Sequence, residues 1–234
     1  MNVTELFRRL SYEKLSTLAM AAEGTGMIIT DQRAKIIAHA NSALTRLYTR
    51  FVLKESDVLL QQKAHITNYQ FLSKFALNGP TGDEEVVRYI FDKPTQPFKG
   101  DVLKILRVTD SMGQDHPLND IDNIMSYFTP QPTTLQIPRP VQGRMINVVY
   151  QASHPSLSYT NLEACIEIPL TLEEALLSYI AGSIFSGMTG QENLAKSQEQ
   201  FAMYESICAG VTETDMVNSS ASQSGSKFED RGFR

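Results

Sequence analysis

The spacing of apolar residues predicts helices at the start of the chain. Residues 3–23 carry apolar side chains at close to helical intervals and predict two short helices or one broken helix, with Thr4 and Ser11 available as N-caps. A longer helix is expected from about Asp31 to Leu53. One of its faces carries a stripe made of Ile37, Ala40, Asn41, Leu44, Leu47, Tyr48 and Phe51.

From Glu55 onward the pattern is that of strands. Short runs rich in β-branched and aromatic residues predict strands at Val58–Gln62, Ile66–Phe71, Val86–Phe91, Asp101–Val108, Thr134–Ile137 and Met145–Tyr150. The fifth of these runs lies between the prolines at 130, 132, 138 and 140. Asp110–Asn123 predicts a solvated, hairpin-like segment in which Asp and Asn side chains close the turns.

The helical pattern returns after Ile168 and Pro169. Thr171 is expected to cap a helix whose apolar face includes Leu172, Leu176, Tyr179, Ile180, Ile184 and Met188, and a final helix is expected from about Gln191 to Ala209. These patterns predict an α+β protein. Residues 1–54 and 169–211 would form one helical bundle, residues 55–168 an inserted β-rich platform domain, and residues 212–234 an extended C-terminal arm.

The composition of the arm differs from that of the rest of the chain. Residues 212–234 are rich in Ser, Gln and Gly and cannot form a core of their own. We expect this segment to become ordered on binding another molecule. Isolated aromatic and arginine side chains are typical anchors of such segments, and here they are Phe228, Arg231, Phe233 and Arg234.

Size and charge narrow the class of protein. A chain of 234 residues with 42% hydrophobic content can bury a stable core. Its net charge of -5 disfavours tight DNA binding, although it is compatible with DNA that only passes through a pore. Cys165 and Cys208 are too few for a disulfide framework, which favours synthesis in a reducing compartment. No signal-peptide pattern or membrane-length apolar run is present, so we expect neither secretion by that route nor a membrane span.

Candidate catalytic chemistry is sparse. The four histidines, His39, His65, His116 and His154, lie in different predicted elements, and no nucleophile signature accompanies them. No metal-binding motif or cofactor-binding motif occurs, so we expect no enzymatic activity, no bound metal and no cofactor. The carboxylates between Asp110 and Asp122 leave a weak cation site open, although turn closure is the favoured interpretation.

Three segments together resemble a known family. The first, Ile37–Phe51, combines an Asn, a Leu-x-x-Leu-Tyr step and a closing Phe; the second is Asp101–Asp110 with Pro117–Asp120; the third is Ile166–Ala181, continuing to Gln191–Asn193 and Tyr204. They are similar to segments of the head-to-tail adaptor, or head completion, proteins of tailed bacteriophages, especially short-tailed ones. The similarity covers about residues 30 to 210 and consists of apolar and turn patterns rather than of a chemical motif.

The resemblance implies a structural subunit of the virion that is made in the host cytoplasm. Such subunits assemble as a ring, usually dodecameric, which joins the portal protein to tail nozzle or tail tube proteins and continues the DNA channel. The arm with Phe228, Arg231, Phe233 and Arg234 would then reach the portal. The alternative is a non-catalytic phage or host protein-binding module. A hydrolase with an unrecognised site is a third possibility, against which the absence of a paired nucleophile and histidine counts.

Overall fold

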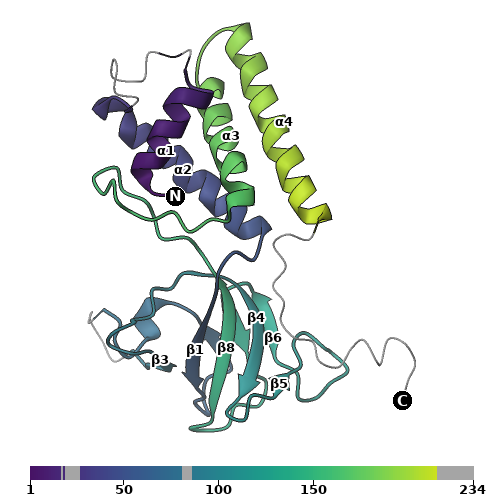
Figure 1. Cartoon of the computed structure of the whole chain (residues 1–234). Helices are drawn as coiled ribbons and strands as arrows, with labels where there is room; N and C mark the ends of the chain where they lie inside the picture. Colours follow the sequence, from purple (N-terminus) through teal and green to yellow (C-terminus); the bar gives the residue numbers. More distant parts are fainter. Residues whose placement is uncertain (17, 19–26, 81–85, 215–234) are drawn as a thin grey trace.

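The α-helices and the sheets occupy opposite ends of the molecule. The computed structural model describes residues 1–16, 18, 27–80 and 86–214. Within these ranges the α-helices lie at one end and two antiparallel sheets at the other (Figure 1), and one short 3-10 helix, η2 (Ser73–Phe75), packs with the sheets. The predicted α+β class is therefore confirmed. None of the helices in the described ranges is long and apolar enough to span a lipid bilayer.

The N-terminal helix is shorter than predicted and has a different cap. Helix α1 (Val3–Arg9) continues directly into one π-helical turn, η1 (Leu10–Lys14). Asn2 caps it, because its side-chain oxygen accepts a hydrogen bond from the backbone nitrogen of Glu5 at 2.8 Å. The caps predicted at Thr4 and Ser11 are therefore wrong. The Thr4 hydroxyl instead donates to the carbonyl oxygen of Leu162, at 3.1 Å.

The other helices lie close to their predicted positions. Helix α2 spans Thr30–Arg50, α3 spans Leu170–Ser186 and α4 spans Gln191–Glu213. The cap predicted at Thr171 is wrong, since Pro169 precedes α3 and provides no side-chain cap. Helix α4 continues past the predicted end at Ala209, so Thr212 and Glu213, which we assigned to the arm, are helical.

The first hydrophobic core draws on both ends of the chain. Helix α3 is buried on most of its surface and packs against α2 and α4. The apolar positions predicted for the α2 stripe are buried in this core. Leu157 and Ile166, from the segment between the last strand and α3, complete it. The early and the late helices therefore share one core.

The strands form a second hydrophobic core. A five-stranded sheet has the order β3-β1-β8-β4-β5, with bounds Ile90–Phe91, Glu55–Gln61, Met145–Ala152, Val102–Asp110 and Asp115–His116. A three-stranded sheet has the order β2-β7-β6, with bounds Asn68–Gln70, Thr134–Gln136 and Phe128–Gln131. Buried residues of both sheets belong to the same core, among them Leu60, Tyr69, Leu135 and Val148.

Two predicted strands are shorter than expected, and two strands, β5 and β6, were not predicted. Strand β3 comprises only Ile90–Phe91 of the strand predicted at Val86–Phe91, and β2 comprises only Asn68–Gln70 of Ile66–Phe71. Strand β6 contains Pro130, one of the prolines that we expected to flank the strand at Thr134–Ile137. Proline is tolerated there because β6 is the edge strand of its sheet, where a missing backbone donor leaves no partner unpaired.

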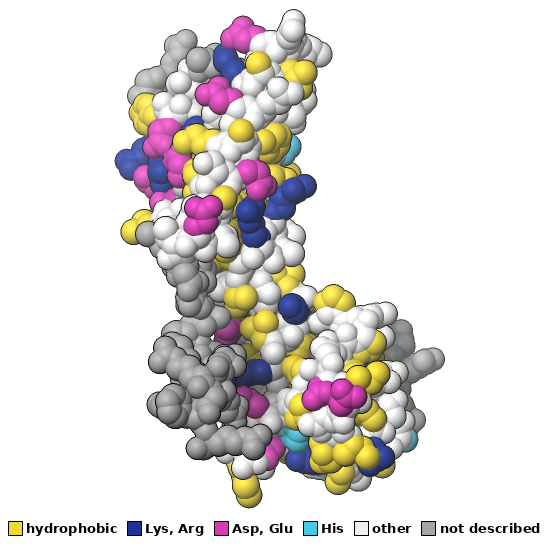
Figure 2. Space-filling view, turned by 90° about the vertical axis from the view of Figure 1, so that its right-hand side faces the viewer, with side chains coloured by type: hydrophobic (Ala, Val, Ile, Leu, Met, Phe, Trp, Pro, Cys, Tyr) yellow, Lys and Arg dark blue, Asp and Glu magenta, His cyan; other side chains and the backbone are white. Residues whose placement is uncertain are grey.

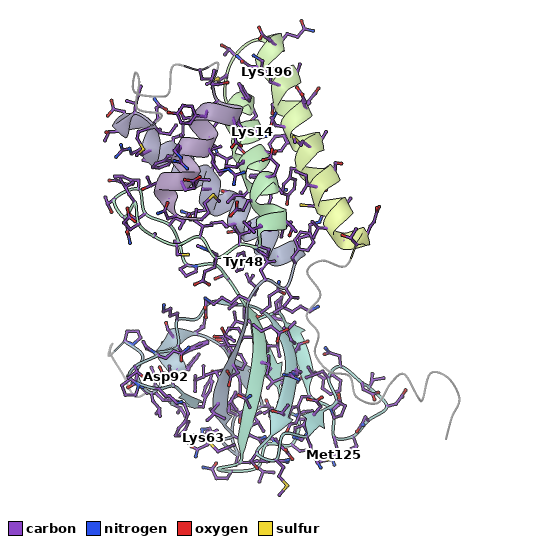
Figure 3. All side chains as sticks on the ribbon, in the orientation of Figure 1. Lys14, Tyr48, Lys63, Asp92, Met125 and Lys196 are labelled. Carbon is purple, nitrogen blue, oxygen red and sulfur yellow. The ribbon has the colours of Figure 1, made fainter. Side chains whose placement is uncertain are left out.

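Polar contacts join the helices to the sheets where the chain passes between them. The Gln151 amide, at the end of β8, donates to the carbonyl oxygens of Tyr48 and Phe51 at the end of α2. The Tyr48 hydroxyl donates to the carbonyl oxygen of Glu167, whose carboxylate pairs with Lys54 at 2.7 Å. Figure 3 labels Tyr48 at this junction. These contacts tie the end of α2 both to β8 and to the segment that leads into α3.

Candidate interaction surfaces

The predicted portal-binding residues lie outside the described part of the chain. Phe228, Arg231, Phe233 and Arg234 all fall within residues 215–234. Their role therefore stays a prediction. Helix α4 ends at Glu213, on the side of the helices that faces the sheets (Figure 1).

The acidic segment uses its side chains to close turns, as predicted. The Asp110 carboxylate accepts hydrogen bonds from the backbone nitrogens of Met112 and Gln114, at 2.8 and 2.9 Å. These bonds, above all the one from Gln114, lower the pKa of Asp110. Asp120 accepts from the backbone nitrogen of Asp122 at 3.1 Å. Within the described ranges, no group of three or more His, Cys, Asp or Glu residues is arranged to hold a metal ion.

The end of this segment and the residues that follow it present three large apolar side chains to solvent. We call residues 119–126 the Ile121 loop. Its apolar side chains are highly exposed, by 87% at Ile121, 67% at Ile124 and 56% at Met125. Figure 3 labels Met125 at the end of the sheets farthest from the helices, and Figure 2 shows hydrophobic side chains gathered at that end of the molecule. Clustered exposed apolar side chains are typical of protein interaction sites.

Hydrogen bonds hold both ends of the Ile121 loop in place. Asn119, in the left-handed region at φ 57°, donates its backbone N–H to the carbonyl oxygen of Tyr127 at 2.8 Å. The Asn119 side chain also accepts from the backbone nitrogen of Thr129, at 2.8 Å. At the other end, the buried Ser126 hydroxyl accepts from the backbone nitrogen of Asp120 at 3.0 Å. The exposed side chains therefore project from a fixed backbone.

Sequence reasoning missed this loop. We predicted a solvated hairpin because Asp and Asn dominate the segment, and the structure shows that these residues close turns. The available signal was the presence of Ile121, Ile124 and Met125 in a segment that contributes little to a core. Apolar residues grouped at solvated turn positions are typical of a contact surface.

A hollow lies where the helices meet the sheets, and we call it the junction groove. Its volume is about 380 Å³. Four elements line it: the end of α2, strand β4, strand β6 with the residue that follows it, and the end of β8. The lining residues are Thr49, Leu103, Lys104, Ile105, Thr129, Pro130, Gln131, Pro132 and Gln151.

The geometry of β4 shapes the groove. Its pairing with β8 shifts between Val102 and Lys104 and again between Ile105 and Arg107. Such irregularities bend a strand and redirect its side chains. Leu103 packs against the helical core, whereas Lys104 is exposed. Within the described residues Lys104 forms no ion pair, so an uncompensated positive charge lies beside apolar walls.

The histidines lie in structural surroundings. His154 is half-buried at the junction, where its ring packs edge-on against Tyr48 and its Nε2 accepts from the backbone nitrogen of Glu167 at 3.1 Å. His116 stacks on Tyr127, with 4.6 Å between the ring centroids. Burial lowers the pKa of both rings and that of His39. Within the described residues, neither the His116 nor the His154 ring makes a hydrogen bond to a serine, threonine or cysteine side chain.

The sequence matches no protein-family model, and a search of the curated proteins returned no match. A functional assignment therefore depends on the resemblance of the three segments and on the surfaces described above.

Proposed function

We propose that this chain is a head-to-tail adaptor subunit of a tailed-bacteriophage particle. In this proposal a ring of copies, expected to be dodecameric, joins the portal protein to tail nozzle or tail tube proteins and continues the DNA channel. DNA would pass through the ring without specific binding, in keeping with the net charge of -5. The protein would be a structural component of the virion and not an enzyme.

The observation that carries the proposal is the division of the chain between two cores. Both helical ends contribute to one core, and the strands between them form the other. This arrangement supports a ring in which the helical bundle is the wedge-shaped part of each subunit. The sheets would then provide a platform for tail proteins. The three segments that carry the family resemblance fall largely on α2, β4 and α3, and so draw on both cores.

The arm would supply the link to the portal. Ordering about fifteen residues costs on the order of 15 to 30 kcal/mol in backbone entropy, so the arm needs extensive contacts with another chain. Assembly should then be sequential, with rings forming only once the portal is present. A ring also needs heterologous contacts, in which one face of each copy meets a different face of the next copy.

Cosedimentation with the portal protein of the same phage tests the proposal. We expect the full chain to cosediment with the portal, and the joint alanine variant of Phe228, Arg231, Phe233 and Arg234 to lose this binding while its melting temperature stays unchanged. A matched control replaces Ser219, Ser220 and Ser222 with alanine and should bind normally. Failure of the full chain to bind the portal would contradict the adaptor function. Closed rings formed at micromolar concentration by the purified chain without residues 215–234 would contradict sequential assembly.

The runner-up, a non-catalytic protein-binding module, gains support from the exposed Ile121 loop, since such a module needs an apolar contact surface. The same experiment separates the two functions. A binding module would sediment alone in the presence of the portal, and an adaptor subunit would not.

A further inference from the structure

We infer that the Ile121 loop of one copy docks in the junction groove of the neighbouring copy around the ring. This inference rests on the proposed function, and it names the contact that holds adjacent subunits together. It uses only described residues, on two surfaces that belong to different elements of the chain.

The loop has the properties of a preformed ligand. Ile121, Ile124 and Met125 are more than half exposed, and the hydrogen bonds of Asn119 and Ser126 fix the backbone that carries them. A segment that is already ordered loses little conformational entropy when it docks. The side chains that enter the groove would lose their contact with water on binding, which favours association.

The groove has the properties of a receptor for aliphatic side chains. Leu103, Ile105, Pro130 and Pro132 give it apolar walls. Its volume of about 380 Å³ is near the lower end of the range of roughly 300 to 1,000 Å³ typical of ligand pockets. A groove of this size fits one or two inserted side chains better than a large cofactor.

Charge complementarity selects the Ile121 loop as the occupant. Exposed Asp120 and Asp122 flank Ile121, and neither carboxylate is ion-paired within the described residues. The groove carries the exposed, unpaired Lys104. Docking would therefore place carboxylates beside a cation at the rim and apolar side chains against apolar walls.

The two surfaces also satisfy the symmetry requirement of a ring. The loop follows β5, whereas the groove lies among α2, β4, β6 and β8. Because the contact joins two different patches, each copy can offer its loop to one neighbour and its groove to the other. Such heterologous contacts close into rings when the rotation between copies allows it.

A charge exchange on the full chain in the presence of the portal tests the contact. We expect Lys104→Glu alone, and Asp120→Lys with Asp122→Lys, each to weaken association between copies at least tenfold, as measured by sedimentation velocity. The three substitutions combined should restore it. Ile121→Ser with Ile124→Ser should also weaken association. Two substitutions at exposed residues serve as matched controls. Lys93→Glu controls for the change of charge, and Val141→Ser controls for the loss of apolar surface. Both variants should assemble normally.

Several outcomes would overturn the inference. The first is that the variant with Ile121→Ser and Ile124→Ser forms normal rings. The second is that the three charge substitutions combined do not restore association between copies. The third is that the chain forms a closed dimer in place of a ring. Disulfide crosslinking in a Cys165→Ser background identifies the occupant directly: Lys104→Cys should crosslink to Asp122→Cys of another copy. Crosslinking to Phe228→Cys instead would assign the groove to the C-terminal segment and contradict the inference. If the wild-type chain does not bind the portal at all, the adaptor function fails, whereas rings that tolerate every substitution refute only this contact.

Discussion

Asn41 connects two distant parts of the helical core through its side-chain amide. Its nitrogen donates to the carbonyl oxygen of Leu157 at 3.1 Å, and its oxygen accepts from the backbone nitrogen of Leu157 at 2.8 Å. The apolar pattern placed Asn41 on the buried face of its helix but did not reveal its partner. Leu157 is 116 positions away in the sequence, and no local pattern joins the two.

Replacement of Asn41 by leucine should destabilise the protein. The variant loses two hydrogen bonds and leaves the backbone groups of Leu157 without their partner, and we expect a loss of about 2 kcal/mol in the free energy of unfolding. Chemical denaturation measures this change. The exposed Ser42→Ala, one residue away in the same helix, should change the stability by less than about 0.5 kcal/mol. Equal effects of the two substitutions would refute the role assigned to the amide.

His154 should make the junction sensitive to acid. Burial lowers its pKa below the ordinary value of 6.5, with a smaller contribution from Lys54, while the hydrogen bond to Pro155 and the charge of Glu167 oppose the shift. Tyr48 packs against the ring, and burial raises the pKa of its hydroxyl to about 12, so it stays protonated over this range. Protonation at Nε2 would also remove the acceptor for the Glu167 backbone nitrogen.

The sign of the pH effect follows from this shift. Below pH 6.5 the unfolded chain binds a proton at His154 more readily than the folded chain does, so the stability falls as the pH drops toward the folded pKa. We expect the slope of unfolding free energy against pH in this window to be smaller in His154→Gln. The exposed His65→Gln serves as the control and should keep the wild-type slope. An unchanged slope in His154→Gln would show that this ring does not couple to folding.

The sequence predicted the helices better than the short strands. Helices α2 and α3 follow from long apolar stripes, whose period is a local property of the chain. Strand β6 could not be predicted from the sequence. It tolerates Pro130 because it lies at the edge of its sheet, and the order of the strands in a sheet has no local signature. The cap at Thr171 was wrong because Pro169 already ends the preceding segment and α3 begins at Leu170.

The close approach of α3 and α4 depends on Gly182. A Cβ atom at this position would lie 3.2 Å from the ring of Phe201, and the Ser197 hydroxyl of α4 donates to the Gly182 carbonyl oxygen at 2.9 Å. We expect Gly182→Leu to cost about 1 to 3 kcal/mol through overpacking. At Gly210 in α4, nothing lies within 4 Å of an added Cβ. Gly210→Leu should therefore raise the melting temperature through helix propensity, and a similar loss in both variants would refute the packing argument.

At the scale of the whole molecule, the sequence indicated which residues belong to helices and strands but not the surfaces they form. The junction groove draws on four elements from Thr49 to Gln151, and the irregular pairing of β4 that shapes it has no local signature. The exposure of Ile121 depends on how the loop is anchored by Asn119 and Ser126. Long-range packing determines both surfaces, and apolar periodicity along the chain does not report it.

Electron cryomicroscopy of the portal protein mixed with this chain would show whether the chain is an adaptor subunit. We expect a closed ring of twelve copies on the portal, with the helices packed into the ring and the sheets facing away as a platform. A portal without bound chain, at saturating concentrations of the chain, would contradict the adaptor function. So would copies bound singly, without contact to one another.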